Sequence, residues 1–206
     1  MIAIIDYDAG NIRSVEKALQ FLGAEVVITR DEKTILSADH VILPGVGSYG
    51  DAMRKIRDYH LDIVLRNIVD QQIPLLGICL GLQLLFERSE EAPGVLGLGI
   101  LPGEIRRIPS GHGLKVPHIG WNSIRFPHHS VLFEGIEEDA YVYFVHSYYL
   151  QAADPRIVTA TTEYGTCIHA AVQAGQVYAC QFHPEKSSDT GLAILKNFIG
   201  TCKGVQ

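Results

Sequence analysis

The sequence predicts an α/β fold, built as a single three-layer domain with a mostly parallel central sheet that antiparallel strands extend in the C-terminal half. In the first half, short β-rich runs alternate with helical patterns, which is the rhythm of a parallel sheet with helices on its faces. After about Pro93, short aromatic and β-branched segments separated by Gly, Pro or Asp are typical of strands and hairpins. No linker, internal repeat or low-complexity tract separates the halves, so we expect one domain over residues 1–206.

The individual elements follow from these patterns and from turn residues such as Gly10, Gly23 and Pro74. In the first half we predict a strand at 2–6, a helix at 11–22, strands at 25–29 and 40–43, a helix at 51–72, a strand at 75–78 and a helix at 80–88. In the second half we predict strands at 103–108, 121–126, 140–145, 157–162, 166–173 and 176–182, and a closing helix at 190–199. This last helix has an apolar face that can pack on the sheet.

Composition indicates a globular protein and argues against two kinds of partner. Of the 206 residues, 47% are hydrophobic and 19% charged, which is enough to bury a sizeable core. Seventeen Lys and Arg against 23 Asp and Glu leave a net charge of −6 without a dense basic stripe, so we expect no nucleic-acid partner. The apolar run 73–79 is well short of the roughly 20 residues of a bilayer span, so we expect no membrane partner.

The start of the chain and its cysteines indicate a cytoplasmic protein. Residues 1–6 lack the charged region and cleavage site of a secretory signal and are typical of a first strand. The cysteines, Cys79, Cys167, Cys180 and Cys202, are sparse and lie in apolar segments. In a reducing compartment they would be thiols and not a disulfide framework.

Cys79 is the candidate nucleophile. It lies where a buried strand turns into a helix, with Gly77 and Gly81 two residues to either side, in the cysteine form of the strand-turn-helix elbow. Glycines suit such a turn because a side chain there would collide with neighbouring segments. The helix N-terminus favours a thiolate, and the backbone N–H of Leu80 could donate to an oxyanion. The alternative is a buried cysteine that acts as a small hydrophobic residue, which we expect for the other three.

His183 and Glu185 are the candidate base and its orienting acid. They follow the strand at 176–182, with Pro184 between them. Side chains two residues apart on an extended chain face the same side, so Glu185 can accept a hydrogen bond from one imidazole nitrogen while the other faces a nucleophile. With Cys79 they form a Cys-His-Glu catalytic triad in chain order. The alternative is a solvated His and Glu at a strand end.

Three blocks of the sequence resemble, in order, the signatures of the class I (triad-type) glutamine amidotransferases. They are Pro-Gly-Val-Gly at 44–47, Gly-Ile-Cys-Leu-Gly-Leu-Gln at 77–83 and Gln-Phe-His-Pro-Glu-Lys-Ser at 181–187. The stretches 6–15 and 115–122 resemble the glutaminase subunits of imidazole glycerol phosphate synthases, a branch of this family in histidine biosynthesis. The resemblance implies a flavodoxin-like core and hydrolysis of L-glutamine to glutamate and ammonia through a cysteine thioester.

The resemblance also implies further site residues. A second oxyanion donor is expected from the backbone at Val46, beside Leu80. Because glycines lie on both sides of Val46, this peptide is free to rotate. We hypothesise that without a partner its carbonyl points inward and leaves the oxyanion hole incomplete. Glutamine contacts are implied for Gly47, Gln83, His146, Ser147 and Tyr148.

The implied partner is a separate synthase chain, a cyclase of (β/α)8 type that forms a heterodimer with the glutaminase. Direct transfer has a physical reason, since ammonia released into bulk solvent would be lost or protonated. A tryptophan in a polar loop, here Trp121, is a common interface anchor, with a core position as the alternative. The implied interface residues are Asn11, Arg13, Ser14, Lys115, His118, Trp121 and Asn122.

Other interpretations find less support. The G-x-G-x-x-G match at 45–50 follows the third strand and not the first, so we expect no dinucleotide cofactor. The adjacent His128 and His129 lack partners at ligand spacing, and we expect neither a metal nor another cofactor. An amidotransferase subunit of another pathway, a cysteine hydrolase that works alone, and a non-catalytic flavodoxin-like binding module remain as alternatives.

Overall fold

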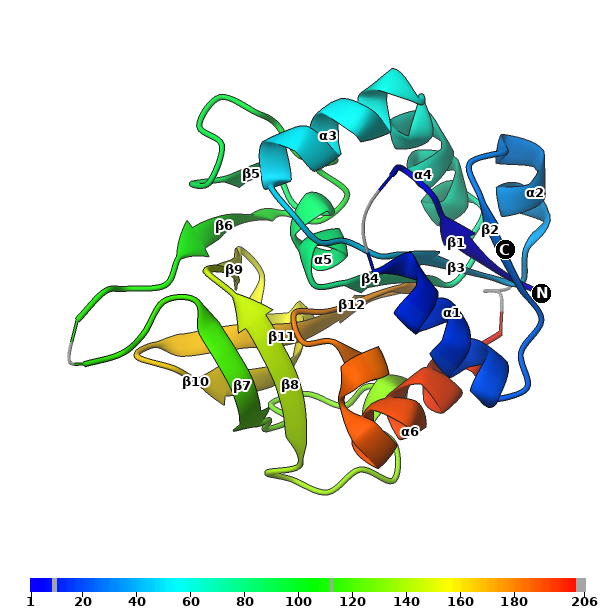
Figure 1. Ribbon diagram of the computed structural model, residues 1–206. Coiled ribbons are helices and arrows are strands. Elements are labelled where there is room, and N and C mark those ends of the chain that lie inside the picture. Colours follow the sequence, from blue (N-terminus) through cyan, green and yellow to red (C-terminus); the bar gives the residue numbers. More distant parts are fainter. Residues whose placement is uncertain (9–10, 112, 203–206) are drawn as a thin grey trace.

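A computed structural model describes residues 1–8, 11–111 and 113–202, and one large sheet runs through its centre (Figure 1). The strands of this sheet are β1 (Ile2–Ile5), β2 (Val26–Thr29), β3 (His40–Leu43), β4 (Leu75–Ile78), β5 (Arg88–Ser89), β6 (Gly103–Arg107), β9 (Tyr148–Ala152), β10 (Val158–Glu163), β11 (Cys167–Ala174) and β12 (Val177–Cys180). Their order is β2-β1-β3-β4-β12-β11-β9-β6-β5, with β10 paired to β11. The first five strands in this order are parallel, and β11, β9 and β6 continue the sheet antiparallel, so the predicted fold class is confirmed.

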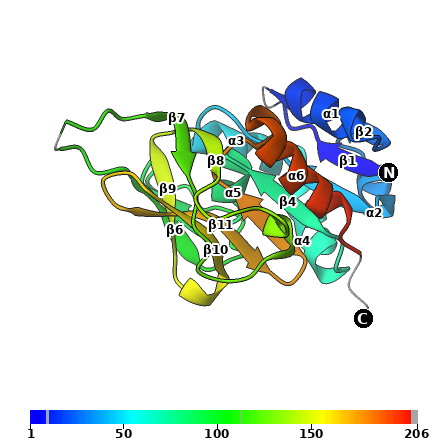
Figure 2. The same cartoon turned by 90° about the horizontal axis from the view of Figure 1, so that it is seen from below.

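Helices cover both faces of the parallel part. In Figure 1, α3 (Tyr49–Asp58) and α4 (Leu61–Asp70) lie above the sheet, and α1 (Ile12–Phe21) and α6 (Ser188–Ile199) lie below it. Figure 2 views the molecule from the side of α1 and α6. The shorter α2 (Glu32–Ser37) and α5 (Leu80–Leu84) pack in the same apolar cluster as α3 and α4. None of the helices within the described residues is long and apolar enough to cross a bilayer.

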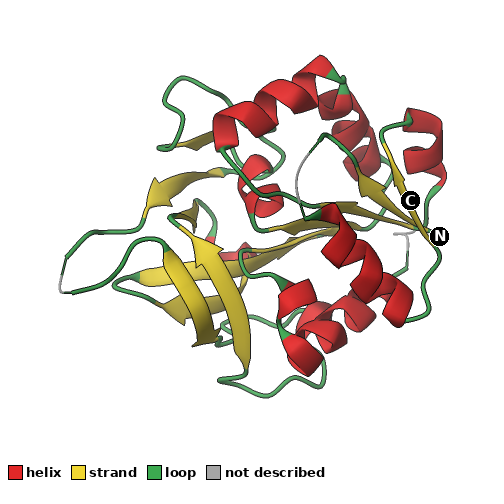
Figure 3. Cartoon of the chain, in the orientation of Figure 1, coloured by secondary structure: helices red, strands yellow, loops and turns green. Residues whose placement is uncertain are grey.

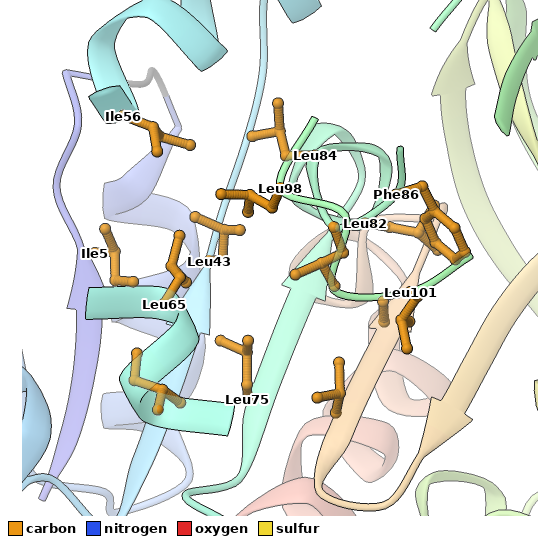
Figure 4. Close-up of a cluster of buried hydrophobic side chains, with 14 of the residues drawn as sticks. Ile5, Leu43, Ile56, Leu65, Leu75, Leu82, Leu84, Phe86, Leu98 and Leu101 are labelled. Atoms are coloured by element: carbon orange, nitrogen blue, oxygen red, sulfur yellow. The ribbon is translucent and has the colours of Figure 1, made fainter. Parts of the chain in front are cut away.

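The alternation of strand side chains explains the two cores. Ala3 and Ile5 of β1 pack in the cluster with α3 and α4, part of which Figure 4 shows, whereas Ile2 and Ile4 pack in the cluster with α1 and α6. Because both faces are covered, β1, β3 and β4 are buried along their whole length. The parallel strands therefore end at one edge in a rigid core, and that edge carries the candidate site.

A second, smaller sheet lies beside the first (Figure 3). It pairs β7 (His118–Ser123) with β8 (Tyr141–His146) in antiparallel register. Only Ser147 separates β8 from β9, so the chain passes from the small sheet to the large one at residues 146–148. Three predicted glutamine contacts lie at this crossing.

Several predicted boundaries were wrong. The single helix expected at 51–72 is two helices, because His60 adopts a left-handed conformation (φ 56°) that an α-helix cannot contain, and no glycine or proline marks the break. The helix expected at 80–88 ends at Leu84, and α2 and β9 were not predicted. Short 3-10 turns are η1 (Val131–Phe133), η2 (Pro155–Ile157) and η3 (Pro184–Lys186).

Candidate active site

Cys79 lies on a strained elbow between β4 and α5. Its backbone (φ 55°, ψ −110°) is outside the conformations that ordinary residues favour, which costs about 1–3 kcal/mol. A Cβ at Gly81 would lie 1.9 Å from the carbonyl oxygen of Leu43, and one at Gly77 would lie 2.9 Å from that of Gly81. The steric reason predicted for these glycines is therefore confirmed. The N–H of Cys79 donates to the carbonyl of Cys180 on β12 (2.8 Å), which ties the elbow to the neighbouring strand.

His183 and Glu185 form a buried pair next to the elbow. Nδ1 of His183 lies 2.8 Å from Oε1 of Glu185, and the side chains are only 2% and 0% exposed. The strand that precedes them ends earlier than predicted, at Cys180, and Glu185 belongs to the turn η3. The pair thus meets across a tight turn and not along an extended strand. The same Glu185 oxygen also accepts a hydrogen bond from Nδ2 of Asn11 (2.8 Å), at the start of α1.

Cys79 and His183 line one pocket and interact electrostatically. Burial lowers the pKa of His183, but its interactions with Cys79 and Glu185 outweigh burial and raise that pKa to about 9. Nε2 of His183 is buried without a hydrogen-bond partner among the described residues. This nitrogen is therefore free to donate to a reacting group. An imidazole that holds its proton at neutral pH beside a sulfur can serve as a general acid.

The pocket has a volume of about 330 Å³, within the range of small-molecule sites. It collects residues from the elbow, the 44–47 block and the crossing between the two sheets. The lining residues are Val46, Gly47, Cys79, Leu80, Gln83, Glu91, Pro117, Val145, His146, Ser147, Tyr148 and His183. All five residues predicted to contact glutamine are among them.

The two predicted oxyanion donors are not both available in this conformation. The N–H of Leu80 donates to the carbonyl of Gly45 (3.3 Å), so the peptide between Gly45 and Val46 presents its oxygen to Leu80. A Cβ at Gly45 would lie 2.7 Å from the backbone nitrogen of Gly81 and 2.8 Å from the hydroxyl of Tyr7. Only glycine therefore allows the 44–47 block to approach the elbow this closely.

His146, which lines the pocket, and His118 form a neutral buried pair. Nδ1 of His146 donates to the carbonyl of Tyr148 (2.9 Å), so its Nε2 accepts the N–H of His118 Nδ1 (3.1 Å). Burial lowers the pKa of His146 to about 3 and that of His118 to about 4. His118 is stacked between Phe144 and Tyr164 and is 3% exposed. Its assignment to a partner interface is therefore corrected: the side chain packs inward and leaves no surface for a partner.

The other interface candidates have different surroundings. Trp121 is 51% exposed, and Arg13 and Lys115 are exposed as well. Ser14 is half-buried, and Asn122 is half-buried with its amide donating to the carbonyl of Glu163 (3.0 Å). Asn11 differs from all of these, because its side chain bonds to Glu185.

Glu91 is a pocket residue that sequence reasoning missed. Its side chain accepts a hydrogen bond from the N–H of Tyr49 (3.2 Å), and burial raises its pKa. It follows the short strand β5 in an irregular segment, and no motif marks it. Within the described residues, no group of three or more His, Cys, Asp or Glu side chains could hold a metal ion.

This chain belongs to the class I glutamine amidotransferase family, whose model, "Glutamine amidotransferase class-I", matches residues 3–202. Among its relatives, the imidazole glycerol phosphate synthase subunit HisH of Moorella thermoacetica is 52% identical over 197 residues, which are 96% of this chain and 93% of that protein. Subunit HisH 1 of Methanococcus maripaludis is 47% identical and covers 97% of this chain and 98% of its own.

Solved structures show the same fold. A structure described as a glutamine amidotransferase has a TM-score of 0.74 at 22% identity and covers 96% of this chain and 99% of its own. A putative GMP synthase component from Thermoplasma acidophilum has a TM-score of 0.71 at 21% identity, with 97% and 92% covered.

Proposed function

We propose that this chain is the glutaminase subunit of an imidazole glycerol phosphate synthase. It hydrolyses L-glutamine to glutamate and ammonia and passes the ammonia to a separate synthase subunit. The observation that carries the proposal is that Cys79, on a strained elbow, lines one pocket with His183, whose imidazole is bonded to the buried Glu185 side chain. The full-length similarity to HisH subunits supports the particular pathway.

The proposed reaction has two halves. The thiolate of Cys79 attacks Cδ of glutamine and forms a C–S bond, while the carbonyl electrons move to oxygen. As the C–N bond breaks, Nε2 of His183 gives its proton to the departing nitrogen, and ammonia leaves. Water then loses a proton to His183 and attacks the thioester, and the C–S bond breaks to release glutamate and the thiolate. Glu185 keeps the imidazole oriented through both halves.

We propose that the rest of the pocket binds the amino-acid end of glutamine. Glu91 offers the half-buried carboxylate that an α-ammonium group requires, and that cation would offset the cost of burying Glu91. Gly47, Gln83, His146, Ser147 and Tyr148 supply the other predicted contacts.

We propose that the 44–47 block gates the reaction. With the carbonyl of Gly45 bonded to Leu80, a tetrahedral oxyanion would meet an oxygen where it needs a donor. Rotation of the Gly45–Val46 peptide would free the N–H of Leu80 and bring in the N–H of Val46. Docking of the partner would favour that rotation, so that glutamine is hydrolysed fastest when ammonia can be received.

The proposed partner is a cyclase of (β/α)8 type that forms a heterodimer with this chain. Exposed aromatic and apolar side chains on the small sheet, Ile119, Trp121 and Tyr141, suit such a contact, together with Arg13, Ser14, Lys115 and Asn122. We also propose a cytoplasmic location, which would keep the free Cys79 thiol reduced. The proposed glutaminase domain extends over residues 1–206.

The deciding experiment compares two nitrogen sources. Synthesis by this chain reconstituted with a synthase subunit is measured with glutamine and with ammonium salt, for the wild type and for Cys79→Ala. We expect Cys79→Ala to lose synthesis from glutamine and to retain synthesis from ammonia. Glutamine-dependent synthesis that survives in Cys79→Ala would overturn the proposal.

A further inference from the structure

We infer that Gln181 is a further positioning residue of the site, which stabilises the thiolate of Cys79 by donating its side-chain N–H to the sulfur. Gln181 follows directly after β12 and is fully buried (0% exposed). Its Nε2 lies 3.7 Å from Sγ of Cys79. The inference deepens the proposed function and rests on it for the role of Cys79 as the nucleophile.

The hydrogen-bond network determines which end of the Gln181 amide faces the sulfur. The carbonyl of Tyr148 can only accept, so Nε2 of Gln83 is the atom that lies 3.0 Å from it. The same nitrogen donates to Oε1 of Gln181 (3.0 Å). With its oxygen engaged there, Gln181 must turn its nitrogen toward Cys79. Its backbone is held as well, since its N–H donates to the carbonyl of Ala170 (2.8 Å).

The other groups around the sulfur leave this donor role to Gln181, because the carbonyl of Val145, 3.9 Å from Sγ, can only accept a hydrogen bond. His183 supplies the positive charge, with Glu185 behind it. Burial and then the charge of Cys79 raise the pKa of Tyr7, and burial, Glu185 and Cys79 raise that of Cys180, so these two groups stay neutral. Glu91 and the neutral His146 line the same pocket.

The hydrogen bond from Gln181 stabilises the thiolate of Cys79 more than it stabilises the thiol. A hydrogen bond to a charged acceptor is roughly twice as strong as one to a neutral acceptor. Because water does not reach the Gln181 side of the sulfur, removal of the donor leaves that side of the anion unsolvated. A hydrogen bond to a buried charge contributes enough to move a titration midpoint by about one pH unit or more.

The link to Gln83 gives the arrangement a second consequence. Gln83 lies in the pocket and also holds the amide of Gln181. The residue proposed to bind the amino-acid end of glutamine is therefore one hydrogen bond away from the residue that solvates the nucleophile. The position of the substrate and the stability of the thiolate therefore depend on the same series of hydrogen bonds, Tyr148–Gln83–Gln181–Cys79.

The test is the pH dependence of Cys79 alkylation by iodoacetamide in the full chain. Modification is followed by mass spectrometry of the peptide that contains Cys79, because Cys167 and Cys202 are exposed and react too. In Gln181→Met, which keeps the volume but lacks the donor, we expect the midpoint of the rate to rise by about one pH unit or more. In Gln181→Glu, which turns a carboxylate oxygen toward the sulfur, we expect a larger rise.

The matched control is Gln173→Met, the same substitution on the adjacent strand β11, which should leave the midpoint unchanged. A wild-type midpoint in a folded Gln181→Met protein would overturn the inference. If thermal unfolding shows that Gln181→Met does not fold, an unchanged midpoint in the isosteric Gln181→Glu decides against it. Such a result, together with a Cys79→Ala enzyme that uses ammonia but not glutamine, would remove the role of Gln181 and leave the proposed glutaminase intact.

Discussion

The two sides of the pocket differ in how far they are prepared for the reaction. On the triad side, His183 and Glu185 are buried and bonded at 2.8 Å, and steric contacts of Gly77 and Gly81 shape the elbow of Cys79. On the oxyanion side, the carbonyl of Gly45 is bonded to Leu80. The fold thus holds the proposed nucleophile and base rigidly, while the proposed gating depends on the orientation of one peptide, between Gly45 and Val46.

A substitution that disrupts the triad side of the pocket should have the largest effect on stability and activity. In Gly81→Ala, the Cβ would lie 1.9 Å from the carbonyl oxygen of Leu43, so we expect a loss of about 3 kcal/mol or more in the free energy of unfolding. Glutamine-dependent synthesis should disappear, because the elbow can no longer approach β3. Urea denaturation and the synthesis assay measure both effects.

The matched control is Gly50→Ala in α3, where the Cβ would lie 3.5 Å from Ala92 in ordinary contact. Its free energy of unfolding should stay unchanged or rise by up to about 1 kcal/mol, since alanine has a higher helix propensity than glycine. Equal stabilities of the two variants would show that the close approach at Gly81 does not shape the elbow.

The second-largest effect should be on the glutaminase rate, and it tests the oxyanion side of the pocket separately from the triad side. Val46→Pro removes the N–H that the proposed rotation would bring to the oxyanion. We expect the glutaminase rate of the reconstituted complex to fall by about 10²- to 10³-fold, the cost of one oxyanion donor. The rate of the isolated chain should change little, because in the proposed gating the carbonyl of Gly45, bonded to Leu80, already leaves the oxyanion hole incomplete.

Val46→Ala is the control, since it keeps the N–H and should retain stimulation by the partner. Steady-state glutamate release with and without the synthase subunit gives the comparison. Equal losses for Val46→Pro in the isolated chain and in the complex would mean that the peptide donates without any rotation.

A smaller effect is expected where α1 contacts the triad. Asn11→Ala removes a hydrogen bond to the charged Glu185, so we expect kcat for glutamine hydrolysis to fall by about tenfold. Gln20→Ala, an exposed change on the same helix, should leave kcat as in the wild type. A wild-type kcat in Asn11→Ala would show that the turn η3 holds Glu185 without this bond.

The smallest effect concerns the dependence of stability on pH, where His183 of the triad side and the His146–His118 pair should act in opposite directions. His146 and His118 have folded pKa values of about 3 and 4, below the unfolded value of about 6.5, so the stability they contribute is present above that pH and lost as pH falls. His183 has a raised pKa of about 9, so its contribution is present below pH 6.5 and lost as pH rises toward 9.

His118→Asn keeps a donor for His146 but does not titrate. Its free energy of unfolding, measured by urea denaturation between pH 4 and 6.5, should depend less steeply on pH than that of the wild type. If the free energy of unfolding of His118→Asn fell as steeply with decreasing pH as that of the wild type, His118 would be protonated in the folded protein.

Local patterns in the sequence predicted the structure correctly in those segments where local steric contacts determine it. Alternation of strands and helices gave the parallel half of the sheet, and the glycines around Cys79 gave the elbow. The break between α3 and α4 escaped prediction, because His60 carries no turn signal and adopts its left-handed backbone through the packing of two amphipathic helices on one core.

Cys79, His183 and Glu185, at the centre of the proposed site, could be named from the sequence because each belongs to a short motif, although His183 and Glu185 meet across the turn η3 and not along the extended strand that we expected. Only the tertiary structure decided the contacts between distant segments: Asn11 on Glu185, Gln181 on the sulfur, Gly45 on Leu80, and the burial of His118. A hydrogen bond between residues far apart in the chain, or the direction in which one peptide points, depends on how whole elements pack, and no local pattern records it.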